Sequence, residues 1–297
     1  MKFTSLGIFC ALAQSLIYVV YDLVGKRLRE EGASALDLTY LMRLALWPAL
    51  ITLALSWNTG VAMQMLHSPA QYGPLLGFVG TWLVYQWVYF RNLNIARSLA
   101  VVSVTRNAIG LPLLMVSGFF INHDVPTLWG YCAVGCIVLG AFVRPRPAQQ
   151  HTRQYLETIQ IIVWLTIAYI VLVTVKDSFY RLYLQNERAL IFGISVYMIL
   201  CSLGLYFFSW IRPRQSTHTV PPRWVAAFVS IWVIGTVPEG IAFGMVPVYT
   251  LVTIGTVSWI ITIGSDLHYG RLSVSSRTAC FIGFVLAGIT CAMIEHY

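Results

Sequence analysis

The stretch ALIFGISVYMILCSLGLYFFSWI, residues 189–211, decides the fold class, because it runs for 23 residues without a charged side chain. A helix needs roughly 20 mainly apolar residues to cross the hydrocarbon core of a bilayer. Similar stretches occur along the chain at residues 4–24, 37–56, 73–90, 98–120, 127–143, 157–175, 223–240, 243–264 and 277–294. The sequence therefore predicts an all-α, polytopic membrane protein with ten transmembrane helices.

The composition excludes an ordinary soluble protein. Of the 297 residues, 58% are hydrophobic and 10% are charged, against about 25% charged residues in a soluble domain. The predicted spans and their connections occupy nearly the whole chain, so no room is left for a separate soluble domain. The net charge of +8 comes from basic residues spread over the connections, where membrane proteins use them for orientation. We therefore expect a lipid bilayer, and no nucleic acid, as a partner.

The polar segment RPRPAQQHTR, residues 144–153, is the connection whose composition differs most clearly from its surroundings. It divides the chain into a first repeat at 1–148 and a second repeat at 149–297, with five predicted spans in each. Because five is an odd number, the second half enters the membrane upside down relative to the first. Two such inverted repeats are the usual construction of small-solute transporters.

Small residues inside the spans indicate where helices pack closely. Gly135-x4-Gly140 in the fifth span recurs as Gly283-x4-Gly288 in the tenth, and small residues at such spacing let helices approach in lipid. The cysteines also lie inside spans, and we interpret them as small packing residues and not as disulfides or metal ligands. They are Cys10, Cys132, Cys136, Cys201, Cys280 and Cys291.

Arg106 is the charged residue placed deepest in a predicted span, beside Ser103 and Asn107 on one side of the fourth span. A charge at the bilayer centre costs about 2.5–3.5 kcal/mol or more, so it requires partners. Two interpretations stay open: a cation that binds an anionic or carbonyl-bearing solute, or an arginine satisfied by Asp22 or by helix carbonyls. For Arg43, nearer the start of the second span, the sequence favours snorkelling or structural pairing.

Polar and aromatic side chains recur on single faces of several spans. Taken one by one, these rings fit core packing or an interfacial belt; together they predict a pocket lined by rings with a few polar groups. Spans one, three, four, six, eight and nine are expected to line it. The candidate solute-binding residues are Gln14, Tyr18, Tyr21, Asp22, Trp82, Tyr85, Gln86, Tyr89, Ser103, Arg106, Asn107, Trp232, Thr236 and Tyr249.

Glu239 follows Pro238 near the end of the predicted span 223–240. Two interpretations are open for its carboxylate: ion coupling, for which Asp22 is the other candidate, or an ordinary position at the membrane interface.

The run 18–50, with Lys26 after the first span and Arg43 inside the second, resembles the opening of the EamA-like branch of the drug/metabolite transporter (DMT) superfamily. The run 96–115 is similar to the same family, with Pro112 amid small and apolar residues. The run 242–261 is similar too, but Ser258 stands at the place equivalent to Pro112.

This resemblance implies a carrier of ten helices in two inverted five-helix repeats that moves metabolites across the cytoplasmic (inner) membrane. Family members often carry an acidic residue after spans four and nine, where this chain offers Asp124 and Asp266 in uncertain register. The family also usually places both termini in the cytoplasm. The basic residues of this chain favour the opposite orientation, because most of them lie in odd-numbered connections. The orientation therefore stays open.

The sequence gives no support for an enzyme, a metal site or a cofactor: it has no paired carboxylates at helical spacing, nucleophile elbow, phosphate loop or metal-ligand cluster. We expect a secondary transporter, monomeric or homodimeric, that moves a small metabolite (an amino-acid-like or other polar or amphipathic solute) by alternating access. Two alternatives are a flippase of the same fold for lipid-linked substrates and a membrane scaffold without transport. A scaffold would have no cavity, and its Arg106 and Gln86 would pair only with other protein groups.

Overall fold

The computed structural model describes residues 5–57, 59–67, 72–95, 99–143, 152–184, 190–211, 221–269, 272 and 274–294, and there the chain forms helices and no strand. The α-helices are α1 (Ser5–Glu30), α2 (Ala35–Leu41), α3 (Leu46–Leu55), α4 (Thr59–His67), α5 (Tyr72–Ile95), α6 (Leu99–Asn122), α7 (Leu128–Phe142), α8 (Thr152–Leu184), α9 (Leu190–Ile211), α10 (Pro222–Met245), α11 (Val248–Gly255), α12 (Val257–His268) and α13 (Ser276–Ile294). The 3-10 helix η1 (Met42–Ala45) joins α2 to α3. The expected all-α fold is confirmed.

In the described residues, six helical stretches are long and apolar enough to cross a membrane. They are Ser5–Glu30, Ala35–Leu55, Ile191–Ile211, Pro222–Met245, Tyr249–His268 and Ser276–Ile294. Large apolar side chains such as Trp164, Trp210 and Phe142 are exposed on the outside of the bundle, where a bilayer would cover them. The protein is therefore a helical membrane protein.

Helix α5 is long enough to span a bilayer, but it is less apolar than those six stretches. Its hydropathy is lowered by Arg91, Asn92 and Asn94 in its last turns and by the polar and aromatic face of Trp82, Tyr85, Gln86 and Tyr89. Trp82, Gln86 and Tyr89 are buried and Tyr85 is half-buried. A helix that turns polar groups toward the inside of a bundle has a low mean hydropathy and is therefore only weakly predicted as a membrane span. The reason is that mean hydropathy counts residues without regard to the face on which they lie.

The corner between α1 and α2 is specified by local sequence. Gly32 adopts a positive φ of 98° after the last turn of α1, and the backbone N–H of Ala33 donates to the Leu28 carbonyl. A glycine in this conformation is a common way to end a helix. Ser34 and Asp37 then form a reciprocal capping box that starts α2. These signals turn the chain back toward the bundle.

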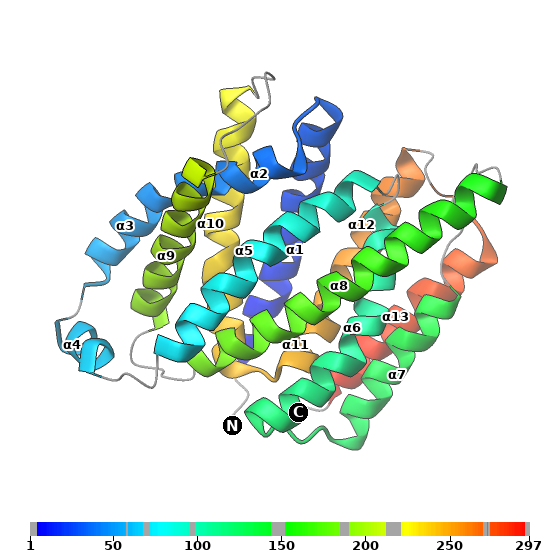
Figure 1. Ribbon diagram of the computed structural model, residues 1–297. Helices are drawn as coiled ribbons and strands as arrows, with labels where there is room; N and C mark the ends of the chain where they lie inside the picture. The colour runs from blue at the N-terminus through cyan, green and yellow to red at the C-terminus, as the bar shows by residue number, and fades with distance from the viewer. Residues whose placement is uncertain are drawn as a thin grey trace.

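The closest helix packing joins helices that are far apart in the sequence. Helix α1 packs along α10, and α5 packs along α8; α11 and α12 contact α1, and α6 contacts α8. The remaining close pairs are α3 with α9 and α7 with α13. In Figure 1, α1 runs upward from the N-terminal end while α8 runs downward across the bundle. Every one of these pairs joins a helix of the first half of the sequence to a helix of the second half.

Several span boundaries differ from the sequence prediction, among them those between the eighth and ninth spans. The eighth span was expected at 223–240 and the ninth at 243–264, but α10 continues to Met245 and α11 begins at Val248. Pro238 is accommodated inside α10, whereas Pro247 stands at the N-cap of α11, a position where its missing N–H is harmless. The predicted span therefore ended at 240, before the last turn of α10.

The two glycine pairs identified in the sequence divide into close-packed and open positions. A Cβ at Gly288 would lie 2.8 Å from Ile137 Cδ1 and 3.0 Å from the Ala133 carbonyl oxygen. A Cβ at Gly140 would lie 3.0 Å from Phe284 Cβ, whereas Gly283 and Gly135 have nothing within 4 Å. One glycine of each pair thus allows the close approach of α7 and α13.

We predict that Gly288→Ala lowers the thermal stability of the purified protein by about 1–3 kcal/mol, because the added methyl group meets backbone as well as side-chain atoms. The matched control is Gly283→Ala, which adds the same methyl group to the same helix in open space. Melting curves in detergent compare the two. Equal stability of both variants would contradict the packing of α7 against α13.

Candidate functional site

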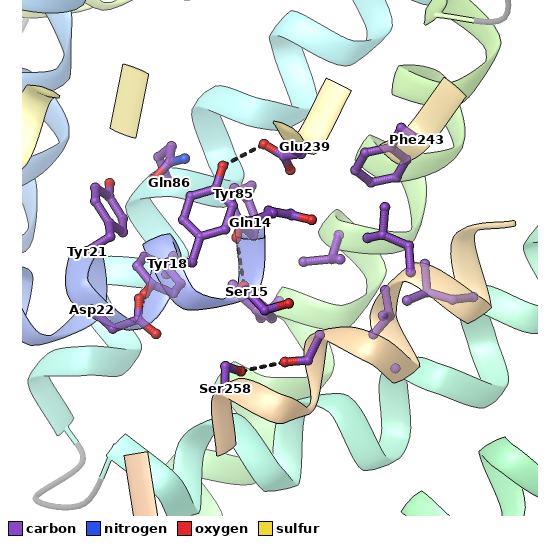
Figure 2. Close-up of a pocket in the computed structure, with 18 of the residues that line it drawn as sticks. Gln14, Ser15, Tyr18, Tyr21, Asp22, Tyr85, Gln86, Glu239, Phe243 and Ser258 are labelled. Carbon is purple, nitrogen blue, oxygen red and sulfur yellow. Dashed lines mark hydrogen bonds between the residues drawn. The ribbon is translucent and has the colours of Figure 1, made fainter. Parts of the chain in front are cut away.

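A cavity of about 160 Å³ lies inside the bundle (Figure 2). Its lining residues come from α1, α5, α6, α8, α10, α11 and α12. These helices correspond to predicted spans one, three, four, six, eight and nine, and they belong to both halves of the sequence. The volume holds on the order of ten water molecules, since one water needs about 10–15 Å³ on this scale. The cavity is therefore large enough for a small solute.

Aromatic rings form much of the wall. The Trp82 and Trp232 ring centroids, from α5 and α10, are 5.3 Å apart, and those of Tyr85 and Tyr169, from α5 and α8, are 5.0 Å apart. The Tyr169 hydroxyl donates to the Tyr85 hydroxyl at 2.8 Å. The rings that line the cavity are those of Tyr18, Tyr21, Trp82, Tyr85, Tyr89, Tyr169, Trp232 and Phe243. Such rings provide rigid apolar surface with polar edges.

A carboxylate from α10 also lines the cavity. The Tyr18 hydroxyl donates to Glu239 Oε2 at 2.5 Å, across 221 positions of sequence, and Figure 2 draws this bond as a dashed line. Glu239 is 7% exposed, and α10 continues beyond it to Met245. Helix α10 does not end at Pro238, so Glu239 lies within the helix and on the cavity wall; the choice between ion coupling and an interfacial position stays open. We name this hydrogen bond the Tyr18–Glu239 link; it joins the two halves at the cavity wall.

Two lining side chains have polar atoms that the surrounding protein does not satisfy. Gln86 is 4% exposed, and its Oε1 has no hydrogen-bond partner among the described residues. The Oγ1 of Thr174 on α8 is also buried and lacks a partner there. Both residues line the cavity. Leaving a buried polar atom unpaired is unfavourable by about 1–3 kcal/mol, so such atoms are poised to bond with something that enters.

Most of the expected solute-binding residues meet at this cavity. Gln14, Tyr18, Tyr21, Asp22, Trp82, Tyr85, Gln86, Tyr89 and Trp232 all line it. Two others are buried elsewhere: the Thr236 hydroxyl donates within its own helix to the Trp232 carbonyl at 2.8 Å, and Tyr249 lies in the first turn of α11. The side chains of Ser103, Arg106 and Asn107 lie outside the described part of the structure. Binding by any of these residues stays a prediction.

Several lining residues were not identified from the sequence. Tyr169 and Thr174 come from α8, and Ser15 and Ser258 from α1 and α12. The span that contains Tyr169 was expected to line the pocket, and a tyrosine placed well inside that span was the available signal. The sequence gave no signal for Ser15 and Ser258. Their hydroxyls donate to backbone carbonyls of their own helical turns, that of Ser15 to Ala11 at 2.7 Å and that of Ser258 to Gly255 at 2.6 Å, as isolated serines in membrane spans commonly do.

The helix that provides Ser258 is interrupted beside the cavity. Helix α11 ends at Gly255 and α12 begins at Val257, with Thr256 between them. Gly255 and Ser258 both line the cavity. Thr256 keeps helical backbone angles (φ −66°, ψ −11°), and i→i+3 hydrogen bonds tighten the helix locally at this point.

Arg43 lies away from this cavity and has structural partners. Its Nη1 donates to Ser209 Oγ at 3.1 Å, and its guanidinium carbon is 5.3 Å from the centroid of the Tyr206 ring. Both partners are on α9. This arrangement agrees with the structural pairing that the sequence favours for Arg43 and ties α9 to η1.

Comparisons with known proteins identify the fold and no family. No family model matches the chain, and no curated protein matches it. Among solved structures, 26 chains match. One, described as "Crystal structure of protein", has a TM-score of 0.62 and 15% sequence identity, over 95% of this chain and 96% of that chain. A likeness at this identity shows a shared fold over nearly the full length of both chains, and the fold alone.

Proposed function

We propose that the protein is a secondary transporter that carries a small solute across the membrane through the cavity described above. The observation that carries this proposal is a cavity bordered by helices of both halves, into which Gln86 and Thr174 bring polar atoms that have no hydrogen-bond partner among the described residues. Carriers place their substrate sites between two repeats and expose them to each side in turn. Solute binding requires polar groups left available in a cavity, whereas helix packing alone does not.

The proposal includes ten crossings arranged as two inverted repeats, 1–148 and 149–297. Support comes from the pairing of helices. Exchanging the halves turns the α1–α10 contact into the α8–α5 contact and the α1–α11/α12 contact into the α8–α6 contact, and leaves the α3–α9 and α7–α13 pairs unchanged. The opposite directions of α1 and α8 in Figure 1 agree with inversion. Membership of the EamA-like branch of the DMT superfamily and location in the inner membrane belong to the same proposal.

A scaffold without transport is the alternative from a different functional class. It predicts no cavity and a Gln86 amide satisfied by protein groups. The cavity and the unpartnered Oε1 of Gln86 favour a carrier instead. A flippase for lipid-linked substrates would use the same fold with an opening toward lipid. The identity of the transported substrate distinguishes a flippase from a carrier of small solutes.

Solute-dependent thermal stabilisation tests this proposal. A ligand that binds the folded state at 100 times its Kd raises stability by about 2.7 kcal/mol, so a screen of metabolite classes in detergent should yield a stabilising compound that proteoliposomes also take up. Gln86→Leu should weaken stabilisation by that compound roughly 10-fold, since it removes the amide that the solute satisfies. The control is Thr290→Val, which alters an exposed hydroxyl on α13. Uptake unaffected by Gln86→Leu would contradict the assignment of this cavity.

A further inference from the structure

We infer that the solute carries a planar cyclic amide edge, an N–H beside a C=O as in a lactam or a nucleobase, and that Gln86 binds this edge while the rings of Tyr18 and Tyr85 pack against the solute ring. This inference rests on the proposed function and specifies the substrate class of the same cavity. Neutral groups of the wall carry this recognition, whatever charges surround the cavity.

The Gln86 side chain is a polar group of the wall that selects for a hydrogen-bond donor. It is 4% exposed, it lines the cavity (Figure 2), and its Oε1 has no hydrogen-bond partner among the described residues. A buried acceptor left without a donor is unfavourable. A solute with an N–H group is therefore favoured over one that brings acceptors alone, such as an ester or a ketone. Sites of this kind discriminate strongly, because an analogue without the donor leaves the buried group unpaired.

The amide of Gln86 also has a definite shape. Its acceptor and its donors lie side by side in one plane, because Oε1 and Nε2 are bonded to the same carbon. It is complementary to a solute edge on which a donor and an acceptor point the same way, the pairing by which glutamine binds the edge of adenine. Open-chain secondary amides are trans, so their N–H and C=O point in opposite directions. The matching edge therefore occurs in primary amides, in lactams and in nucleobases.

Two tyrosine rings on the wall favour the flat members of this class. Tyr18 and Tyr85 line the cavity and are half-buried, and each hydroxyl is bonded to another helix. Tyr18 forms the Tyr18–Glu239 link to α10, and Tyr85 accepts a hydrogen bond from Tyr169 on α8 at 2.8 Å. Rings held in this way offer a fixed aromatic surface, which packs best against another planar π-system. An aliphatic amide or a saturated ring lacks such a face.

A second neutral group fits the same class of solute. Thr174 Oγ1 is buried, and it has no hydrogen-bond partner among the described residues. Thr174 lines the cavity on α8, the helix that packs along α5, which carries Gln86. A hydroxyl both donates and accepts hydrogen bonds. It therefore suits a further N–H or C=O of a heterocycle that carries more than one polar atom.

Three probes with one bicyclic skeleton separate the edge from the ring face: 2-quinolone, 1-methyl-2-quinolone and octahydroquinolin-2(1H)-one. The first has the N–H beside the carbonyl on a planar ring, the second has this donor replaced by an N-methyl group, and the third keeps the edge on a saturated framework. Calorimetry on the purified full chain measures binding. We expect 2-quinolone to bind, N-methylation to weaken binding about 10-fold, and saturation to weaken it about 3–10-fold.

Gln86→Met assigns the effect of the N–H group to this residue. Methionine fills a similar volume without the amide, so 2-quinolone and its N-methyl derivative should bind this variant within about 2-fold of each other. A glutamine with a purely structural role would instead change the binding of both probes by the same factor. The control is Thr290→Val on the exposed face of α13, which should keep the full discrimination. The comparison of probes on the unmodified chain decides if Gln86→Met does not fold.

Four results would each overturn the inference: no binding of 2-quinolone, equal binding of its N-methyl derivative, equal binding of the saturated probe, or a preference for 2-quinolone that persists in Gln86→Met. The proposed function is judged separately, by proteoliposome uptake of a stabilising metabolite. Uptake with which 2-quinolone does not compete contradicts this inference alone. Binding of 2-quinolone that depends on Gln86, without uptake of any metabolite, contradicts transport alone.

Discussion

Gly110→Leu is expected to abolish solute binding and uptake while the protein still inserts and folds. Gly110 lies on α6 and lines the cavity, and a Cβ built there meets one atom within 4 Å, Ile170 Cγ1 at 3.6 Å. A methyl group therefore fits in ordinary contact, whereas the branched leucine side chain occupies a large part of a cavity of about 160 Å³. Uptake into proteoliposomes measures the expected loss of transport, and the melting temperature measures whether the variant stays folded.

Two controls separate blocking from misfolding. Gly110→Ala should keep most of the uptake, since its methyl group contacts Ile170 without clashing. Gly80→Leu places the same leucine on α5 at an exposed position with nothing within 4 Å of the added Cβ, and it should behave like the unmodified protein. Normal uptake by Gly110→Leu would show that solute does not pass through this cavity.

Arg106→Leu is expected to abolish transport with insertion and folding intact. Arg106 precedes Gly110 by four positions and Leu114 by eight on α6, and both of those residues line the cavity. Residues four apart share a helix face, so we expect the guanidinium to face the space between the halves, within reach of Tyr18 or Asp22. Packing does not require an arginine there, because leucine or methionine fills a similar volume in lipid.

Arg106→Lys should restore transport only in part, since a point charge does not reproduce the planar fork of a guanidinium. The measurement is uptake by both variants at equal amounts of folded protein in the membrane. Normal transport by Arg106→Leu, or a guanidinium that reaches the lipid headgroups, would assign Arg106 a structural role.

The parts of this structure that follow from sequence are those with a local cause. Helical spacing was enough to group Gln14, Tyr18 and Asp22, and separately Trp82 and Gln86, on faces that the structure turns into the cavity. Apolar length was enough to predict the helices themselves. These inferences depend only on the 3.6-residue period and on the bilayer as a solvent.

The parts that do not follow depend on partners far away in the chain. No feature of the sequence near Glu239 indicates that its hydrogen-bond partner is Tyr18, which lies 221 positions earlier. Nothing near Pro238 distinguishes it from Pro247, because a proline inside a membrane helix is tolerated only when neighbouring helices accommodate it. The close approach at Gly288 and the open space at Gly283 likewise depend on which face of α13 meets α7, and identical residues give no sign of that difference.

The most direct test of the central claim is the accessibility of the cavity from each side of the membrane. Ser258 lines the cavity, and Ser258→Cys, made in a chain whose native cysteines are replaced, introduces one thiol there with little change in volume. An impermeant thiol reagent should label this cysteine from either side of sealed vesicles, and addition of Gly110→Leu should protect it. A thiol that reacts from one side only, or from neither, would contradict alternating access and with it the proposal that this protein is a carrier.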